Sequence, residues 1–161
     1  MQDLRTEVVL KLAQIINPQV RANEKFSLDL EFLRQLPDGT LGREVAHFLD
    51  QNGFDPLNSG DWVQRTHDIW HVLTGLSASE HDEFVLQAFV RSQVFRPSSA
   101  ILVIAGLLTR KCNLKEVAQS IKTGRLAKHI VEWDIESDWE TPLELVRQKL
   151  GIVPLSVYSL K

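Results

Sequence analysis

The chain has 161 residues, of which 43% are hydrophobic and 24% are charged, and its formal net charge is −3. A chain of this size and composition can bury the core of a globular domain, and its weak negative charge excludes a strongly basic surface for nucleic acid. The single cysteine, Cys112, excludes an internal disulfide framework and is typical of proteins in a reducing compartment.

The first residues do not have the composition of a targeting segment. Asp3 and Glu7 interrupt the apolar residues of segment 1–16, whereas a signal peptide needs a continuous apolar stretch and a transit peptide lacks acidic residues. The longest apolar run, Ala100–Leu108, is too short to span a bilayer. We expect it to form a buried helix, with shallow contact with a membrane surface as the alternative, and we expect a cytoplasmic protein.

Periodic apolar residues predict three helices in the first third of the chain. The first ends at Pro18, the second stops before the Pro-Asp-Gly sequence at 37–39, and the third is capped by Thr40 and ends at Gly53. The side chains expected to face inward are Leu4, Val8, Leu12 and Ile15 in the first, Leu28, Phe32 and Leu36 in the second, and Leu41, Val45, Phe48 and Leu49 in the third.

Two further helices are predicted to form a hairpin around Gly75. Asp61 is expected to cap the first of them, with Gln64 as its capping-box partner. The Ser-Ala-Ser-Glu sequence at 77–80 is a second capping box, and it opens a helix that runs to about Phe95. Glu83 would then lie in the first or second turn of that helix.

The last third of the chain contains three more helix starts. Pro97-Ser98-Ser99 opens the apolar helix, Asn113 with Glu116 caps the next, and the sequence at 141–144 combines a capping box with proline at the first helical position. No convincing run of alternating strand residues is present. The sequence therefore predicts an all-α protein with a single domain over residues 1–161 and roughly seven or eight helices.

Two histidines and two carboxylates have the spacing of a metal site. His67 and His71 are four residues apart, so on a helix they lie on one face. Asp68 is three residues before His71 and is its neighbour on the helix surface. Glu83 lies on the second helix of the hairpin, which would place it near the two histidines. Two neutral imidazoles and two carboxylates would nearly neutralise a divalent ion. The sequence therefore predicts His67, Asp68, His71 and Glu83 as metal ligands.

This motif has other interpretations. The two histidines can instead cap backbone carbonyls or pair with nearby acids. HDxxH also invites comparison with the HExxH of metalloproteases, in which the acid is the general base, but Asp is one methylene shorter than Glu and no edge strand for a peptide is predicted. His81, which lies between two acids, is expected to be solvated, and His47 and His129 to be ordinary surface or core residues.

Segment 67–83 reads HDIWHVLTGLSASEHDE, which is HDxxH followed by eleven residues and Glu. This motif resembles the signature of the ubiquinone (coenzyme Q) biosynthesis protein 4 family. The resemblance covers roughly residues 30–155, and because the chain is short and lacks a targeting segment, we expect a bacterial homologue. The other matching residues are LPDGTLGRE at 36–44 before the motif, and Gly124-Arg125, Glu132, Trp139-Glu140, Pro142 and LGI at 150–152 after it.

The resemblance implies that His67, Asp68, His71 and Glu83 hold zinc, with magnesium, manganese or iron as alternative metals. It also implies an all-helical homodimer that works at the inner face of a membrane with other quinone-biosynthesis proteins and binds a prenylated lipid or quinone precursor. Two roles stay open. One is an enzyme that removes the ring carboxyl group oxidatively and leaves a hydroxyl group, and the other is a non-catalytic lipid-binding scaffold with a structural metal.

The apolar helical faces offer a place for such a lipid. Segments 84–95 and 100–108 are apolar almost all round. They either line a tunnel for a prenyl tail, whose burial would contribute about 25 cal/mol per Å², or form two central core helices.

Overall fold

The computed structural model describes residues 11–158, and the regular elements in this part are helical, which confirms the predicted all-α class. Residues 11–16 are helical, and an isolated bridge joins Thr40 to Pro142. The α-helices are α2 (Leu30–Arg34), α3 (Leu41–Asn52), α4 (Trp62–Arg65), α5 (His67–Thr74), α6 (Glu80–Gln93), α7 (Pro97–Leu108), α8 (Leu114–Leu126) and α9 (Leu143–Leu150), and the 3₁₀ turns are η1 (Ile130–Glu132), η2 (Glu136–Asp138) and η3 (Leu155–Tyr158).

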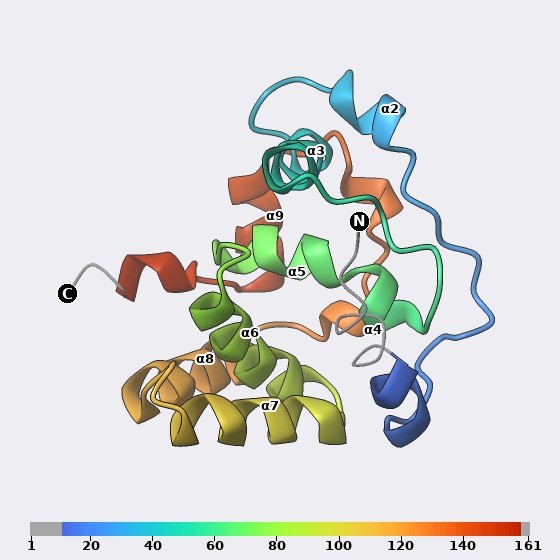
Figure 1. The fold of residues 1–161 in the computed structure, drawn as a ribbon. Coiled ribbons are helices and arrows are strands. Elements are labelled where there is room, and N and C mark those ends of the chain that lie inside the picture. The colour runs from blue at the N-terminus through green and yellow to red at the C-terminus, as the bar shows by residue number, and fades with distance from the viewer. Residues whose placement is uncertain (1–10, 159–161) are drawn as a thin grey trace.

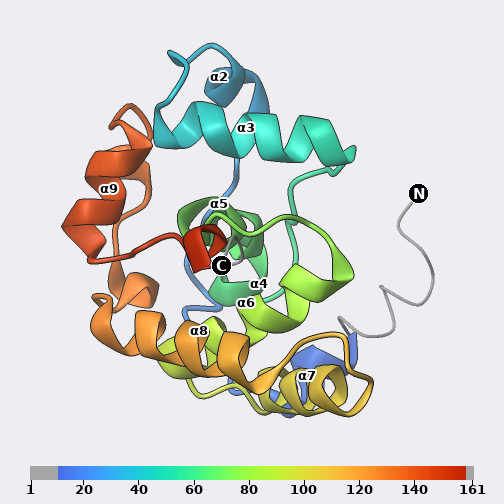
Figure 2. The same ribbon diagram turned by 90° about the vertical axis from the view of Figure 1, so that its left-hand side faces the viewer.

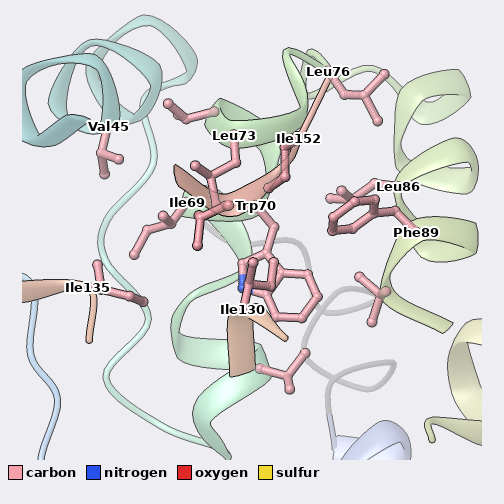
Figure 3. Close-up of a cluster of buried hydrophobic side chains, with 14 of the residues drawn as sticks. Val45, Ile69, Trp70, Leu73, Leu76, Leu86, Phe89, Ile130, Ile135 and Ile152 are labelled. Atoms are coloured by element: carbon pink, nitrogen blue, oxygen red, sulfur yellow. The ribbon is translucent and has the colours of Figure 1, made fainter. Parts of the chain in front are cut away.

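Helix α5 lies at the centre of the molecule. In both ribbon views α2 and α3 lie on one side of it, and α6, α7 and α8 lie on the opposite side (Figures 1 and 2). Its side chains Ile69, Trp70 and Leu73 are at most 1% exposed. In Figure 3 they lie between Val45 of α3 and Phe89 of α6, and the rings of Trp70 and Phe89 are 6.1 Å apart. The apolar side chains of α5 therefore fix this helix firmly in the core.

The predicted helix that follows Asp61 is in fact two helices, α4 and α5, which meet at Thr66. Asp61 caps α4 and forms the predicted capping box with Gln64. The Thr66 hydroxyl group donates a hydrogen bond to the Trp62 carbonyl oxygen and accepts one from Nε1 of Trp70. The break between the two helices thus lies at Thr66, which is fully buried and forms hydrogen bonds with a backbone and a side-chain group. The apolar pattern of the sequence does not reveal such a break.

The predicted core residues near the start of the chain are only partly correct. Leu4 and Val8 lie outside the described residues, and Leu12 and Ile15 are exposed. Helix α2 buries Leu33, which is not part of its predicted stripe. The third helix agrees better, because Thr40 caps α3 as predicted and Gly53 ends it with a φ of 64°.

Helix α7 is not the buried helix that its composition predicts. Its side chains at 101, 104 and 108 are 58%, 56% and 80% exposed, so its bulky residues form an apolar surface. No helix in the described part of the chain is long and apolar enough to span a membrane. The exposed residues are Ile101, Ile104 and Leu108, and the buried ones are Ser99, Val103 and Gly106.

A glycine explains which face of α7 packs inward. A Cβ atom at Gly106 would lie 2.7 Å from the Phe84 ring and 2.9 Å from the sulfur of Cys112. A side chain at this position would overlap Phe84 of α6, so Gly106 allows the two helices to approach each other closely here. The bulky residues Ile101, Ile104 and Leu108 lie on the exposed side of α7, whereas Leu107 packs partly against the core.

Candidate metal centre

Helices α5 and α6 form the predicted hairpin, and its turn is fixed at both ends. Gly75 ends α5 with a φ of 70°, a left-handed conformation that glycine adopts without steric cost. Ser79 caps α6 by accepting a hydrogen bond from the backbone N–H of Asp82. The predicted cap was Ser77, but this residue instead donates hydrogen bonds to the Asp82 carboxylate. Glu83 therefore lies in the first turn of α6, next to α5.

Three of the four predicted ligand residues bring one donor atom each to a common point. Nε2 of His67 and Nε2 of His71 lie 3.0 and 3.2 Å from Oε2 of Glu83, and 3.2 Å from each other. Ligand atoms that bind zinc tetrahedrally at about 2.0–2.1 Å are about 3.3 Å apart. The three residues thus have nearly the ligand spacing that a zinc ion requires, and their donor types fit a divalent metal.

An unprotonated imidazole nitrogen and a carboxylate oxygen are both hydrogen-bond acceptors, so each close contact in this cluster needs either a proton between the two atoms or a metal ion that binds both. Burial alone would lower the pKa of His67, but the charge of Glu83 and the hydrogen bond to it raise that pKa above 6.5. Burial alone would raise the pKa of Glu83, but the charge of His67 and the hydrogen bonds with His67 and His71 hold that pKa well below 4.5. Without a metal, a proton held by His67 can therefore bridge this ring and the Glu83 carboxylate.

The two carboxylate oxygens of Glu83 have different surroundings. Oε2 faces both histidines, whereas Oε1 accepts a hydrogen bond of 2.6 Å from Nε2 of Gln87. Oε1 of Gln87 in turn accepts a hydrogen bond of 2.6 Å from the hydroxyl group of Ser99 in α7. The spacing patterns of the sequence did not predict a role for Gln87 or Ser99 in the site. The available signal was a polar residue one turn after Glu83 in a largely apolar part of the helix.

The cluster is closed on one side and open on the other. The side chain of His71 is 3% exposed, and its ring stacks on Phe48 with 5.2 Å between ring centroids. Nδ1 of His71 has no hydrogen-bond partner among the described residues, so packing against Phe48 helps to set the orientation of the ring. The side chains of His67 and Glu83 are 23% and 35% exposed. A ligand from solvent would therefore approach from the side of these two residues.

Asp68 lies beside this group of three but is not part of it. Its side chain is buried, and no described residue donates a hydrogen bond to its carboxylate. Burial raises the pKa of Asp68, and the charges of His67 and His71 offset this effect only in part. Successive residues of a helix point about 100° apart, which explains why Asp68 does not share the direction of the adjacent His67.

The other histidine near the hairpin lies outside the cluster. Nδ1 of His81 is 2.8 Å from the Asp82 carboxylate and Nε2 is 3.2 Å from that of Glu116, and the side chain is 43% exposed. The prediction that His81 is solvated is therefore only partly right, because the ring is half-exposed and both of its nitrogens contact carboxylates. Because it lies outside the cluster, His81 is a suitable control position for substitutions in the metal centre.

Comparison with known sequences identifies relatives over most of the chain. The model of the family described as coenzyme Q (ubiquinone) biosynthesis protein Coq4 matches residues 11–156. The mitochondrial ubiquinone biosynthesis protein COQ4 homologues of Mus musculus and Bos taurus are 30% and 29% identical to this chain, over 88% and 92% of its length. The matched parts cover 60% and 64% of these two proteins, so the chain spans less than two thirds of their length.

A solved structure shares the fold. The crystal structure of a protein from Nostoc punctiforme PCC 73102 matches with a TM-score of 0.66 and 21% sequence identity. The match covers 93% of this chain and 82% of that chain. The helical arrangement seen here is thus also that of an experimentally determined structure.

Proposed function

The chain belongs to the coenzyme Q (ubiquinone) biosynthesis protein Coq4 family, and we propose that it holds a divalent metal between α5 and α6 and acts with it on a prenylated aromatic ring. One observation supports this most directly. His67, His71 and Glu83 present three donor atoms 3.0–3.2 Å apart at a partly exposed point. We propose zinc as the metal, because two histidines and one glutamate with a further open position form the ligand set of some catalytic zinc sites.

The predicted set of four also includes Asp68, which lies beside the three converging residues, and we propose it as the second carboxylate of the site. If Asp68 binds the ion directly, only a metal with more than four ligands keeps a position open for the substrate. A dication beside Asp68 would favour its ionised form and oppose the effect of burial on its pKa. Together, the two carboxylates of Asp68 and Glu83 would neutralise a divalent ion, which lowers the cost of burying each charge.

The proposed reaction is the oxidative decarboxylation of the ring acid. Replacement of a ring carboxyl group by a hydroxyl group takes its oxygen atom from water, releases carbon dioxide and two protons, and removes two electrons. Dioxygen accepts the two electrons and the two protons and becomes hydrogen peroxide. When bound, the metal would act as a Lewis acid on the ring carboxylate or an adjacent hydroxyl group. His67, His71 and Glu83 would fix the ion, and the stacked rings of His71 and Phe48 would exclude water from one side of it.

The test uses the full chain loaded with zinc, manganese or iron and, as substrate, a prenylated hydroxybenzoic acid labelled at its carboxyl carbon. In air, we expect labelled carbon dioxide and a product that carries a hydroxyl group at the former carboxyl position, as detected by mass spectrometry. Turnover that survives complete removal of the metal would contradict the mechanism. Stoichiometric metal binding without any turnover would instead indicate a structural metal.

Metal affinity is expected to depend on pH through the histidines rather than through Glu83. The pKa of His67 is raised and that of Glu83 is strongly lowered, so the proton that a metal must displace lies on an imidazole. As the pH falls below the pKa of His67, the affinity for zinc should fall about tenfold per pH unit. Competition with a chelator between pH 5.5 and 8.5 measures this dependence. A constant affinity over this range would contradict the prediction.

We further propose that the exposed apolar side chains of α7 contact the prenyl tail of the substrate. Burial of such surface contributes about 25 cal/mol per Å², and Ile101, Ile104 and Leu108 are more than half exposed. Helix α6 is a core helix instead, since Leu86 and Phe89 are fully buried (Figure 3). The tail would therefore lie on α7 rather than in a tunnel lined by both helices.

The variant Ile104→Glu is expected to take up less prenyl lipid than the wild type, because a charge within the apolar surface opposes contact with a hydrocarbon tail. Native mass spectrometry after addition of a prenyl lipid measures the bound fraction. Leu145→Glu on α9 is the matched control, because Leu145 is 52% exposed and lies on a different helix. Equal uptake by the two variants and the wild type would exclude α7 as the lipid contact.

A further inference from the structure

We propose that Gln87 is a positioning residue that holds one carboxylate oxygen of Glu83 toward the histidines, and that Ser99 holds Gln87 in place. The role of this arrangement in metal binding rests on the metal centre proposed above. Gln87 lies one helical turn after Glu83 on α6, and Ser99 lies in the first turn of α7. Two hydrogen bonds of 2.6 Å connect Ser99 to Gln87 and Gln87 to Glu83.

The chemistry of the three groups determines the direction of both hydrogen bonds. An ionised carboxylate only accepts hydrogen bonds, so the amide nitrogen of Gln87 must face Glu83. The amide oxygen then faces Ser99, and because an amide oxygen also only accepts, the Ser99 hydroxyl group must donate. Gln87 and Ser99 are 8% and 0% exposed, so water does not readily replace either partner. Each of the two side chains therefore has one preferred orientation.

This arrangement limits what Glu83 can offer to a metal. The terminal torsion of a glutamate side chain is soft and broad, and Glu83 is partly exposed, so packing alone would not fix its carboxylate. The hydrogen bond from Gln87 occupies Oε1 and leaves Oε2 at 3.0 and 3.2 Å from the two imidazole nitrogens. Glu83 is thereby prepared to act as a ligand through a single oxygen.

A second buried glutamine on the same helix provides a matched control. Gln93 is 6% exposed, donates a hydrogen bond to the carbonyl oxygen of Gly124 and accepts one from the backbone N–H of Ile130. It resembles Gln87 in residue type, burial and number of hydrogen bonds, but it does not contact Glu83. A purely structural role for Gln87 would make the two positions respond alike.

The experiment compares zinc and cobalt binding by the full-length wild type and by Gln87→Leu, Ser99→Ala, their double variant and Gln93→Leu. Gln87→Leu is expected to bind zinc about 10–100-fold more weakly, as is typical when the hydrogen-bond partner of a metal ligand is lost. Ser99→Ala should show a smaller loss, and the double variant should lose no more than Gln87→Leu, because both act through one contact. Gln93→Leu should lose thermal stability but keep its affinity and its cobalt absorption spectrum.

Wild-type zinc affinity and an unchanged cobalt spectrum in both Gln87→Leu and Ser99→Ala would overturn the inference. If Gln87→Leu fails to fold, Ser99→Ala decides it alone. If the wild type itself binds neither zinc nor cobalt, the proposed metal centre is wrong, and crystal structures of the metal-free variants decide the orientation of Glu83. Displacement of Oε2 from the histidine nitrogens in Gln87→Leu or Ser99→Ala would support the positioning role, and an unchanged Glu83 in both would overturn it.

Discussion

The variants Glu83→Gln and His71→Ala are each expected to weaken zinc binding by more than about 100-fold. Loss of a residue that hydrogen-bonds to a metal ligand typically costs about 10–100-fold in affinity, and loss of the ligand itself should cost more. Glu83→Gln keeps the size of the side chain but removes the negative charge that lies 3.0 Å from Nε2 of His67 and 3.2 Å from that of His71. His71→Ala removes the most buried donor of the cluster. Metal analysis of the purified variants and competition with a chelator measure the two losses.

Thermal unfolding gives a second measure of the same prediction. A ligand present at 100 times its dissociation constant stabilises the native state by about 2.7 kcal/mol, so zinc should raise the Tm of the wild type. It should not raise the Tm of Glu83→Gln or His71→Ala. His81→Ala, which removes a half-exposed histidine of the same hairpin that lies outside the cluster, should respond to zinc like the wild type. Tight, stoichiometric zinc binding by Glu83→Gln and His71→Ala would contradict the metal centre.

The part of the site that sequence analysis predicted depends on local spacing. His67 and His71 share a helix face because of the 3.6-residue period, and Gly75 and a serine cap mark the turn that brings Glu83 back. These signals lie within a few residues of each other in the chain. They therefore predict the hairpin without knowledge of the tertiary contacts around it. In the structure, three of the four predicted ligand residues lie together.

The part that sequence analysis missed depends on contacts between distant residues. Ser99 reaches Gln87 from another helix, and no periodic pattern connects the two positions. The exposure of α7 was missed for a related reason, because apolar composition predicts burial only where enough neighbouring surface exists to cover it. Gly106 allows α7 to approach α6 by its small face, which leaves Ile104 outside the core.

A buried ion pair supports the segments around the metal centre and leads to the second large expected effect. Nη1 of Arg96 lies 2.6 Å from Oδ2 of Asp61, and the two side chains are 5% and 0% exposed. Asp61 also accepts hydrogen bonds from the backbone N–H groups of Val20 and Gln64. The pair thus joins the start of α4, the segment before α2 and the residue that precedes α7.

Arg96→Met is expected to lower the free energy of unfolding by about 3–5 kcal/mol, because it leaves the buried Asp61 carboxylate without its counter-charge. The double variant Asp61→Asn/Arg96→Met also lacks the negative charge of the Asp61 carboxylate, and the asparagine side-chain oxygen can still cap α4. Its free energy of unfolding should therefore recover most of the loss seen in Arg96→Met. Urea unfolding of the single and double variants measures the coupling. Arg34→Met, which breaks the exposed pair with Asp50, should have little effect. A double variant no more stable than Arg96→Met would show that shape, rather than charge, makes Arg96 necessary.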